Sequence, residues 1–150
     1  MNSSLEAIDR AILRELSEDG RCSFTDLAER VGLSVSAVHQ RVRRLEQRGV
    51  LRGYQGQLDY EQVGLPLTAF ISVTPIDPSA PDDYPQRLEH LREIEACYSV
   101  AGDYSYILLV RVARATALED LLRRIRESAN VSTKTTVVLS TPYEARPPAV

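Results

Sequence analysis

The sequence predicts an α+β protein in which a cluster of short helices precedes a β-α-β-β-α-β domain. Three observations indicate this organisation. Helix-start patterns crowd the first 50 residues, the hydrophobic period changes after Gly49, and strand-like runs then alternate with amphipathic helical runs. We expect a helical domain at 1–50, a linking strand or wing at 51–65, the second domain at 66–141 and a loosely held, proline-rich tail at 142–150.

Four helix starts share one pattern, in which a hydroxyl residue is followed three positions later by an acid. They are Ser3 with Glu6, Ser23 with Asp26, Ser79 with Asp82, and Thr116 with Glu119. The hydroxyl caps the first free amides of a helix, so each pair predicts an N-terminus. The first helix is expected to run to about Asp19, and the second to end at Gly32, which suits a left-handed cap.

A third helix is expected from its capping residue Ser34 to Gly49, which ends it. Its apolar residues Val38, Val42 and Leu45 recur at the helical period and form a narrow inward seam. Three helices packed so closely along the chain predict a single folded unit.

The second and third helices are spaced as in a DNA-binding helix-turn-helix. Apolar residues, a small residue and a glycine turn stand where the motif needs them: Leu27, Ala28, Val31, Gly32, Leu33 and Val38. In this motif the second of the paired helices enters the major groove of double-stranded DNA. The first domain is therefore predicted to be a winged-helix-like helix-turn-helix whose recognition helix is the third helix of the chain.

The exposed face of the recognition helix is basic. From Ser34 to Arg52 five arginines accompany one acid, Glu46, which gives a net charge of +4 within a chain of net charge −3. Guanidinium groups pair with phosphate oxygens or guanine, and Ser or Gln can read base edges. We expect DNA contacts from Ser34, Ser36, Ala37, His39, Gln40, Arg41, Arg43, Arg44 and Arg48. The alternative is a solvated arginine-rich surface without function.

Ala37 occupies the third position of its helix, where the other predicted helix starts carry Asp or Glu. An acid there would repel a phosphate that approaches the helix N-terminus, so alanine favours DNA binding. The alternative is that a small residue is needed for packing.

After the third helix the pattern becomes extended. Val50–Tyr54 and Gln55–Leu58 are interpreted as a small wing or linking strand. Beyond Pro66 we expect strands at Leu67–Val73, Ile94–Val100, Tyr106–Val112 and Val131–Leu139, with helices at Pro81–Leu91 and Ala117–Ser128. This order predicts a ferredoxin-like domain, an antiparallel sheet covered on one face by two helices.

Composition narrows the class of protein. The first residues lack a secretory signal, and no apolar run approaches the roughly 18 residues of a membrane span, so we expect a cytoplasmic protein without a membrane partner. Cys22 and Cys97 have no metal-ligand spacing, which favours free thiols and no metal or other cofactor.

Several segments of the chain resemble one family. The matching segments are Leu5-Glu6-Ala7-Ile8-Asp9, Asp19-Gly20-Arg21, Leu27-Ala28, Val31-Gly32-Leu33-Ser34, Arg41-Val42-Arg43-Arg44-Leu45-Glu46 and Gly49-Val50-Leu51. They are similar to the DNA-binding half of the Lrp/AsnC family of feast/famine transcription factors, and the second domain resembles that family's sensing domain. The resemblance implies regulation of amino-acid-related genes, homodimers joined through the sensing-domain sheets, further assembly to tetramers or octamers, and a small effector, commonly an amino acid.

The turn between the two middle strands is the predicted effector loop. The residues concerned are Ser99, Val100, Ala101, Gly102, Asp103, Tyr104, Ser105 and Tyr106. Amides in a glycine turn can hold a carboxylate and a nearby acid an ammonium group. The family commonly has aspartate where this chain has Ser105, so either Asp103 substitutes, or the ligand differs, or the response is lost. The tyrosines favour a bulky apolar or aromatic amino acid; an ordinary hairpin turn is the alternative.

Two other classes of function compete with a switchable regulator. An enzyme would need a nucleophile, phosphate loop or metal set beside His39 or His90, and the sequence shows none, so no enzymatic activity is expected. An effector-independent protein that wraps or bridges DNA would share the helix-turn-helix and differ only in the effector loop.

Overall fold

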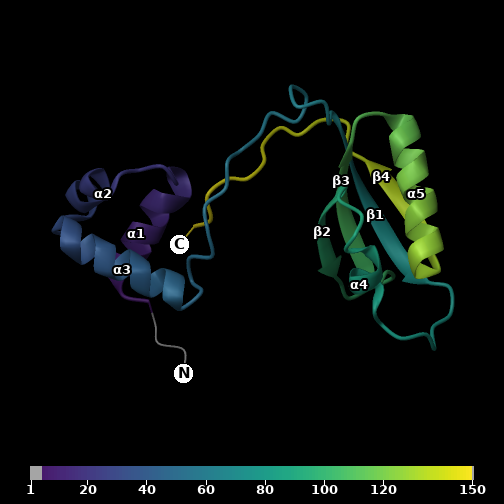
Figure 1. Ribbon diagram of the computed structural model, residues 1–150, viewed down its shortest axis with the longest axis horizontal. Coiled ribbons are helices and arrows are strands. Elements are labelled where there is room, and N and C mark those ends of the chain that lie inside the picture. Colours follow the sequence, from purple (N-terminus) through teal and green to yellow (C-terminus); the bar gives the residue numbers. More distant parts are fainter. Residues whose placement is uncertain (1–4, 150) are drawn as a thin grey trace. The chain divides into compact units, whose positions relative to one another are not determined.

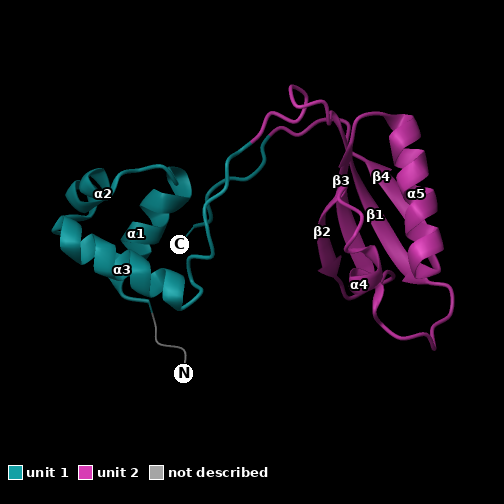
Figure 2. Ribbon diagram, viewed as in Figure 1, with its two compact units in different colours: residues 1–57, 143–150 teal, residues 58–142 magenta. Residues whose placement is uncertain are grey.

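The computed structural model describes residues 5–149, which fall into two units (Figure 2). The first unit holds the residues up to Gln57 together with those from Tyr143 onward, and the second is Leu58–Pro142. Both ends of the described chain therefore belong to the same unit. For residues 142–150 the sequence predicted a loosely held tail.

The first unit contains three helices, α1 (Ala7–Glu18), α2 (Phe24–Val31) and α3 (Val35–Gln47) (Figure 1). Their apolar faces meet in one core, in which each side chain is at most 7% exposed. The core residues are Ile12, Leu16, Leu27, Ala28, Val38, Val42 and Leu45. The inward seam predicted for the third helix is thus confirmed.

Capping fixes where the helices of the first unit begin and end. The Ser23 hydroxyl accepts from the Asp26 amide at 3.0 Å, as its sequence pattern predicts. Gly32 follows α2 with φ of 69°, the left-handed conformation that glycine adopts without strain. Glu6 occupies the N-cap of α1, and the predicted cap Ser3 lies outside the described residues.

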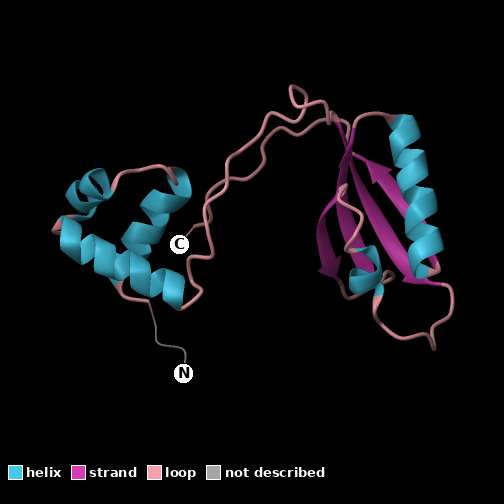
Figure 3. Cartoon of the chain, in the orientation of Figure 1, coloured by secondary structure: helices cyan, strands magenta, loops and turns pink. Residues whose placement is uncertain are grey.

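The segments Val50–Tyr54 and Gln55–Leu58, predicted as a wing or linking strand, are not strands in the structure. Among residues 5–149 no strand precedes Leu67, and the linking segment is irregular chain (Figure 3). Three of the apolar residues that suggested strands are exposed, with Val50 at 38%, Tyr54 at 48% and Leu58 at 58%, whereas Leu51 packs against the core of the first unit. An alternating pattern forms a strand only where a neighbouring strand satisfies its backbone groups, and none of the strands formed by residues 5–149 pairs with this segment.

The second unit is a four-stranded antiparallel sheet in the order β2-β3-β1-β4, with two helices. Its elements are β1 (Leu67–Pro75), α4 (Tyr84–Leu88), β2 (Ile94–Ser99), β3 (Tyr106–Val112), α5 (Ala115–Ala129) and β4 (Val131–Val137). The two helices cover one face of the sheet (Figure 1). The predicted α+β class and the ferredoxin-like strand order are confirmed.

The core of the second unit lies between this face and the helices. Strand residues at alternate positions, among them Ile71, Val73, Leu108 and Val110, are fully buried there. From α5 the buried stripe includes Leu121 and Ile125.

The opposite face of the sheet, which we call the outer face, carries no helix of the described chain. By strand alternation and register it bears Thr68, Phe70, Ser72, Tyr98, Ile107, Leu109, Arg111 and Lys134. Phe70 is 39% exposed and Tyr98 52% exposed.

The helix predicted at Pro81–Leu91 is shorter, since α4 spans only Tyr84–Leu88. The predicted cap Ser79 is used elsewhere. Its amide and hydroxyl donate to one carboxylate oxygen of Asp77, at 2.9 and 2.7 Å, in a local turn. Asp82, the predicted capping-box acid, accepts a hydrogen bond from a tyrosine of β3.

The start of α5 also differs from its prediction. The helix begins at Ala115 with Arg114 as N-cap, and Arg114 lies two residues before the predicted cap Thr116. The Thr116 hydroxyl accepts from Nε of Arg114 at 3.0 Å and makes no capping bond.

Candidate DNA interface and effector loop

Helix α3 presents a polar and basic face. Seven of the nine predicted DNA-contact residues are exposed: Ser34, Ser36, His39, Gln40, Arg43, Arg44 and Arg48. The buried seam on the other side of the helix orients this face outward. Arg43 and Arg44 make no ion pair with any residue of 5–149, so their guanidinium groups are available to an anionic partner.

The N-terminus of α3 is capped by Ser34, whose hydroxyl accepts from the Ala37 amide at 3.2 Å and lies 3.2 Å from the Ser36 hydroxyl. Ala37 itself is half-buried. The first turn of α3 contains no acid, but α4 and α5 lack one too. The prediction that α3 alone lacks an acid at this position is therefore wrong, although its N-terminus is free of like charge toward a phosphate.

Arg41 is paired within the first unit, and its contact with DNA stays a prediction. Its guanidinium forms ion pairs with Asp9 at 2.8 Å and with Glu6 at 3.0 Å. Asp9 is only 5% exposed. The hydrogen bond to Asp9 raises the pKa of Arg41 further above its ordinary value. Arg41 thus fastens α3 to α1, and without it the segment from Ser34 to Arg52 contributes +3 instead of +4.

His39 also has a packing role. Its ring lies 4.2 Å from the ring of Phe24, at an interplanar angle of 76°, an edge-to-face contact between α3 and α2. It remains exposed on the other side. His39 can therefore hold the two helices of the motif together and still reach a ligand.

The effector loop is a tight connection between β2 and β3. Ser99 pairs with Tyr106 at its base, and the Val100 amide donates to the Ser105 carbonyl at 3.1 Å. The Ser105 amide donates to the carbonyl of Val73 at 3.0 Å, which ties the loop to β1. These bonds fix the base of the loop and leave its tip projecting.

The tip consists of Ala101, Gly102 and Asp103, all exposed. Gly102 has φ of 133°, a conformation that other residues rarely adopt. The Asp103 carboxylate has no side-chain partner among the described residues. Tyr104 is half-buried, with its ring centroid 5.9 Å from Nζ of Lys134.

Tyr106, which was predicted to contact the effector, is a member of the core of the second unit. Its ring is 8% exposed and lies 6.1 Å from that of Tyr84. Its hydroxyl donates to Asp82 at 2.9 Å, and this bond to a carboxylate raises the pKa of Tyr106.

Metal ligands, cysteines and membrane-spanning helices can be stated for the described residues. Within 5–149 no three His, Cys, Asp or Glu side chains are grouped so that they could hold a metal ion. Cys22 and Cys97 are free thiols. None of the helices in this part of the chain is both long and apolar enough to cross a membrane.

Known proteins share both units. A winged helix-turn-helix DNA-binding family matches residues 5–52, and the Lrp/AsnC ligand binding domain matches residues 68–148. The HTH-type transcriptional regulator LrpA of Mycobacterium tuberculosis is 60% identical over 146 residues, which are 97% of each chain. This chain belongs to the Lrp/AsnC family.

More distant and structural relatives agree with this assignment. The leucine-responsive regulatory protein of Escherichia coli is 40% identical over 121 residues, 79% of this chain and 73% of the other. A solved feast or famine regulatory protein of M. tuberculosis, complexed with L-methionine, matches with a TM-score of 0.92 at 60% identity, covering 94% of this chain and 96% of that chain.

Membership of the Lrp/AsnC family confirms the predicted transcription regulator, because the relatives are named as regulators and not as enzymes. The residue-level DNA and effector contacts stay predictions.

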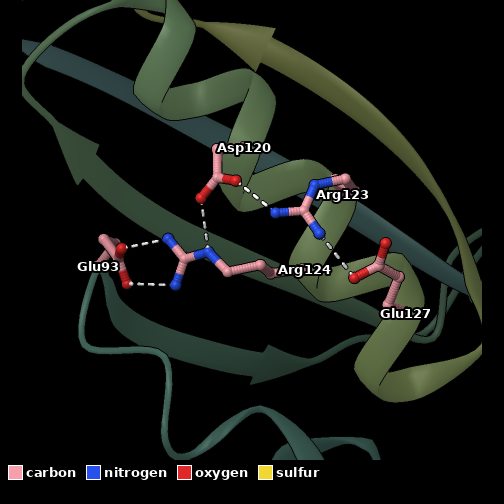
Figure 4. A network of polar contacts seen from close by, with 5 residues as sticks. All are labelled: Glu93, Asp120, Arg123, Arg124 and Glu127. Carbon is pink, nitrogen blue, oxygen red and sulfur yellow. Dashed lines mark hydrogen bonds and ion pairs between the residues drawn. The ribbon is translucent and has the colours of Figure 1, made fainter.

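Sequence reasoning missed one group of residues in the Lrp/AsnC sensing domain. Arg111 is 5% exposed, although it is charged. Glu93 and Arg124 join the chain before β2 to α5 (Figure 4). The sequence pattern that could have predicted this group is the arginine directly after the apolar run Ile107–Val110, because a charged side chain in a buried strand needs a partner.

Proposed function

We propose that this Lrp/AsnC regulator binds operators through α3 and that an amino acid bound at the loop of residues 99–106 changes its DNA affinity or its assembly. The observation that carries the DNA half is the separation of α3 into a buried seam and an exposed face, on which Arg43 and Arg44 make no ion pair with any described residue. We place its action in the cytoplasm, with the chromosome.

On DNA, the exposed side chains divide by chemistry. Arg43, Arg44 and Arg48 suit phosphate oxygens or guanine, whereas Ser36 and Gln40 suit base edges in the major groove. Ser34, Ala37 and the α3 N-terminus suit a phosphate. Arg41 supports α3 from behind and makes no DNA contact in this proposal.

At the effector loop, an α-amino acid has two groups to satisfy. The exposed backbone around Gly102 suits its carboxylate, and the open Asp103 carboxylate suits its ammonium group. The L-methionine complex of the 60% identical M. tuberculosis protein supports a bulky apolar amino acid as the first candidate. With Tyr106 in the core, the contacts come from the remaining residues of the loop.

The outer face of the sheet supports self-association. Phe70, Tyr98, Ile107 and Leu109 leave an apolar surface that no helix of the described chain covers. We propose a homodimer joined through this face, with further assembly to tetramers or octamers. Phe70→Arg should lower the molecular mass measured by sedimentation to that of a monomer; a variant of unchanged mass would place the interface elsewhere.

The decisive test titrates the twenty amino acids, L-methionine first, against the purified protein. Binding is followed by calorimetry, and affinity for DNA selected from a random library is followed by fluorescence anisotropy. A change in DNA affinity or mass on binding supports the switch, and Asp103→Asn should weaken the binding. If no amino acid binds, Ser105 in the family's aspartate position marks a lost response, and the alternative function, an effector-independent DNA organiser, replaces the regulator with a switch.

A further inference from the structure

Arg111 is a buried charge at the point where three segments of the second unit meet. It lies on β3 on the outer face, and its side chain is 4% exposed. Its Nε donates to the Thr68 hydroxyl of β1 at 3.3 Å, and an Nη donates to the Glu95 carboxylate of β2. Its guanidinium carbon lies 3.6 Å from the ring centroid of Tyr60, in the chain that enters the sheet.

Tyr60 is held in place by an ordered turn, so its position over Arg111 is defined. The Leu65 amide donates to the Tyr60 carbonyl at 2.7 Å, and the Val63 amide to the Asp59 carbonyl at 3.1 Å. The Asp59 carboxylate accepts from the Gln62 side chain at 2.6 Å. The last part of the linker is therefore a fixed cover over the guanidinium.

Glu95 reaches Arg111 because of an irregularity in β2. The register with β3 shifts between Ile94 and Ala96, so Glu95 sits at a bulge. A bulge bends its strand and redirects a side chain. Here it directs a carboxylate toward the outer face.

The chain just before the bulge is fixed on the helix side as well. Both oxygens of Glu93 meet the guanidinium of Arg124, which also donates to Asp120 at 2.8 Å (Figure 4). The Arg111 amide donates to the Glu93 carbonyl at 3.2 Å. The start of β2 is thus bonded to Arg124 on the helix-covered face of the sheet and to Arg111 on the outer face.

We propose that Arg111 is a positioning residue that couples β2 to the linker through Glu95 and Tyr60. The proposal rests on the proposed effector site, because β2 leads directly into the loop of residues 99–106. Separating a buried guanidinium from a charged partner costs free energy. If Glu95 shifts along β2, we therefore expect the guanidinium of Arg111 to move with it, and the ring of Tyr60 to move with Arg111. Tyr60 lies in the linker that leads to the DNA-binding unit, so a movement of its ring changes the position of the linker.

The test separates coupling from a purely structural brace by measuring the effector response. Tyr60→Leu keeps an apolar side chain of similar size and removes the ring; Tyr60→Phe restores the ring. Val63→Ala, an exposed position in the same turn, is the matched control. For each variant we would measure L-methionine binding by calorimetry, melting temperature, and affinity for selected DNA with and without saturating L-methionine.

We expect all variants to bind L-methionine and effector-free DNA within about threefold of the wild type. The factor by which L-methionine changes DNA affinity, typically about 5 to 150 in coupled systems, should fall toward 1 in Tyr60→Leu and be kept in Tyr60→Phe and Val63→Ala. Glu95→Gln, which probes the other side of Arg111, should also lose the response and serves if Tyr60→Leu does not fold.

An undiminished response in folded Tyr60→Leu or folded Glu95→Gln overturns the coupling and leaves the proposed function intact. If the wild type neither binds nor responds to L-methionine or any other amino acid, the proposed effector function fails and the coupling falls with it.

Discussion

Replacing Arg41 with alanine should destabilise the first unit before it affects any DNA contact. Asp9 has 7% of its side chain exposed and Arg41 25%, so the variant leaves a nearly buried carboxylate without its cation. Breaking a buried pair in this way costs about 3–5 kcal/mol. Because a quarter of the Arg41 side chain reaches water, we expect the lower end, about 3 kcal/mol, a large part of the roughly 5–15 kcal/mol that stabilises a typical domain.

The measurement is urea unfolding followed by circular dichroism, with Arg43→Ala as the matched control. Arg43 lies on the same helix but is exposed and unpaired, so its variant should change the free energy of unfolding by less than about 0.5 kcal/mol while weakening DNA binding. Asp9→Asn in the Arg41→Ala background should recover part of the loss, because it removes the uncompensated charge. Equal stability of the Arg41→Ala and Arg43→Ala variants, with loss of DNA affinity in both, would refute this reasoning and return Arg41 to the DNA face.

Three further predictions follow from the geometry. Arg44→Ala should weaken binding to all DNA sequences alike and lower the slope of log affinity against log salt by about 0.9, the value for one phosphate contact; an unchanged slope would exclude that contact. The Arg124 guanidinium lowers the pKa of Glu93 below its ordinary 4.5, so this pair stabilises the fold above that pH, and its contribution is lost as the pH falls through the lowered pKa. The Glu93→Gln variant should therefore lose less stability than the wild type at acid pH. An identical loss of stability in both proteins would count against this role of Glu93. Gly32→Ala should cost about 1 kcal/mol in thermal unfolding, because φ is 69° while no atom would meet the added methyl group within 4 Å; no loss would mean that the turn relaxes.

Local patterns predicted most of the fold. The seam of Val38, Val42 and Leu45 and the strand Tyr106–Val112 follow from hydrophobic period, which depends only on near neighbours in the chain. The capping of α2 by Ser23 is equally local.

What the sequence did not predict depends on contacts between distant segments. Arg41 falls on the polar side of a helical wheel, and only the packing of α1 against α3 shows that Asp9 lies beside it. Ser79 has the spacing of a helix cap, but Asp77 competes for its amide and hydroxyl. The segment Val50–Leu58 alternates in sequence but is no strand in the described structure, because alternation alone does not supply a partner strand.

Residues 143–149 group with the first unit, although the ligand-binding family matches through residue 148, so the end of the sensing-domain sequence belongs structurally to the DNA-binding unit. The chain leaves the DNA-binding unit after Gln57 and returns to it at Tyr143, and Pro148 lines a hollow of 760 Å³ together with α1 and the residues that follow Val50. A chimera that gives this protein another member's effector specificity must therefore be spliced at two junctions. If everything after Gln57 were exchanged, the residues from Tyr143 onward would also come from the other protein. They would then line the hollow beside α1 with different side chains and disturb the DNA-binding unit.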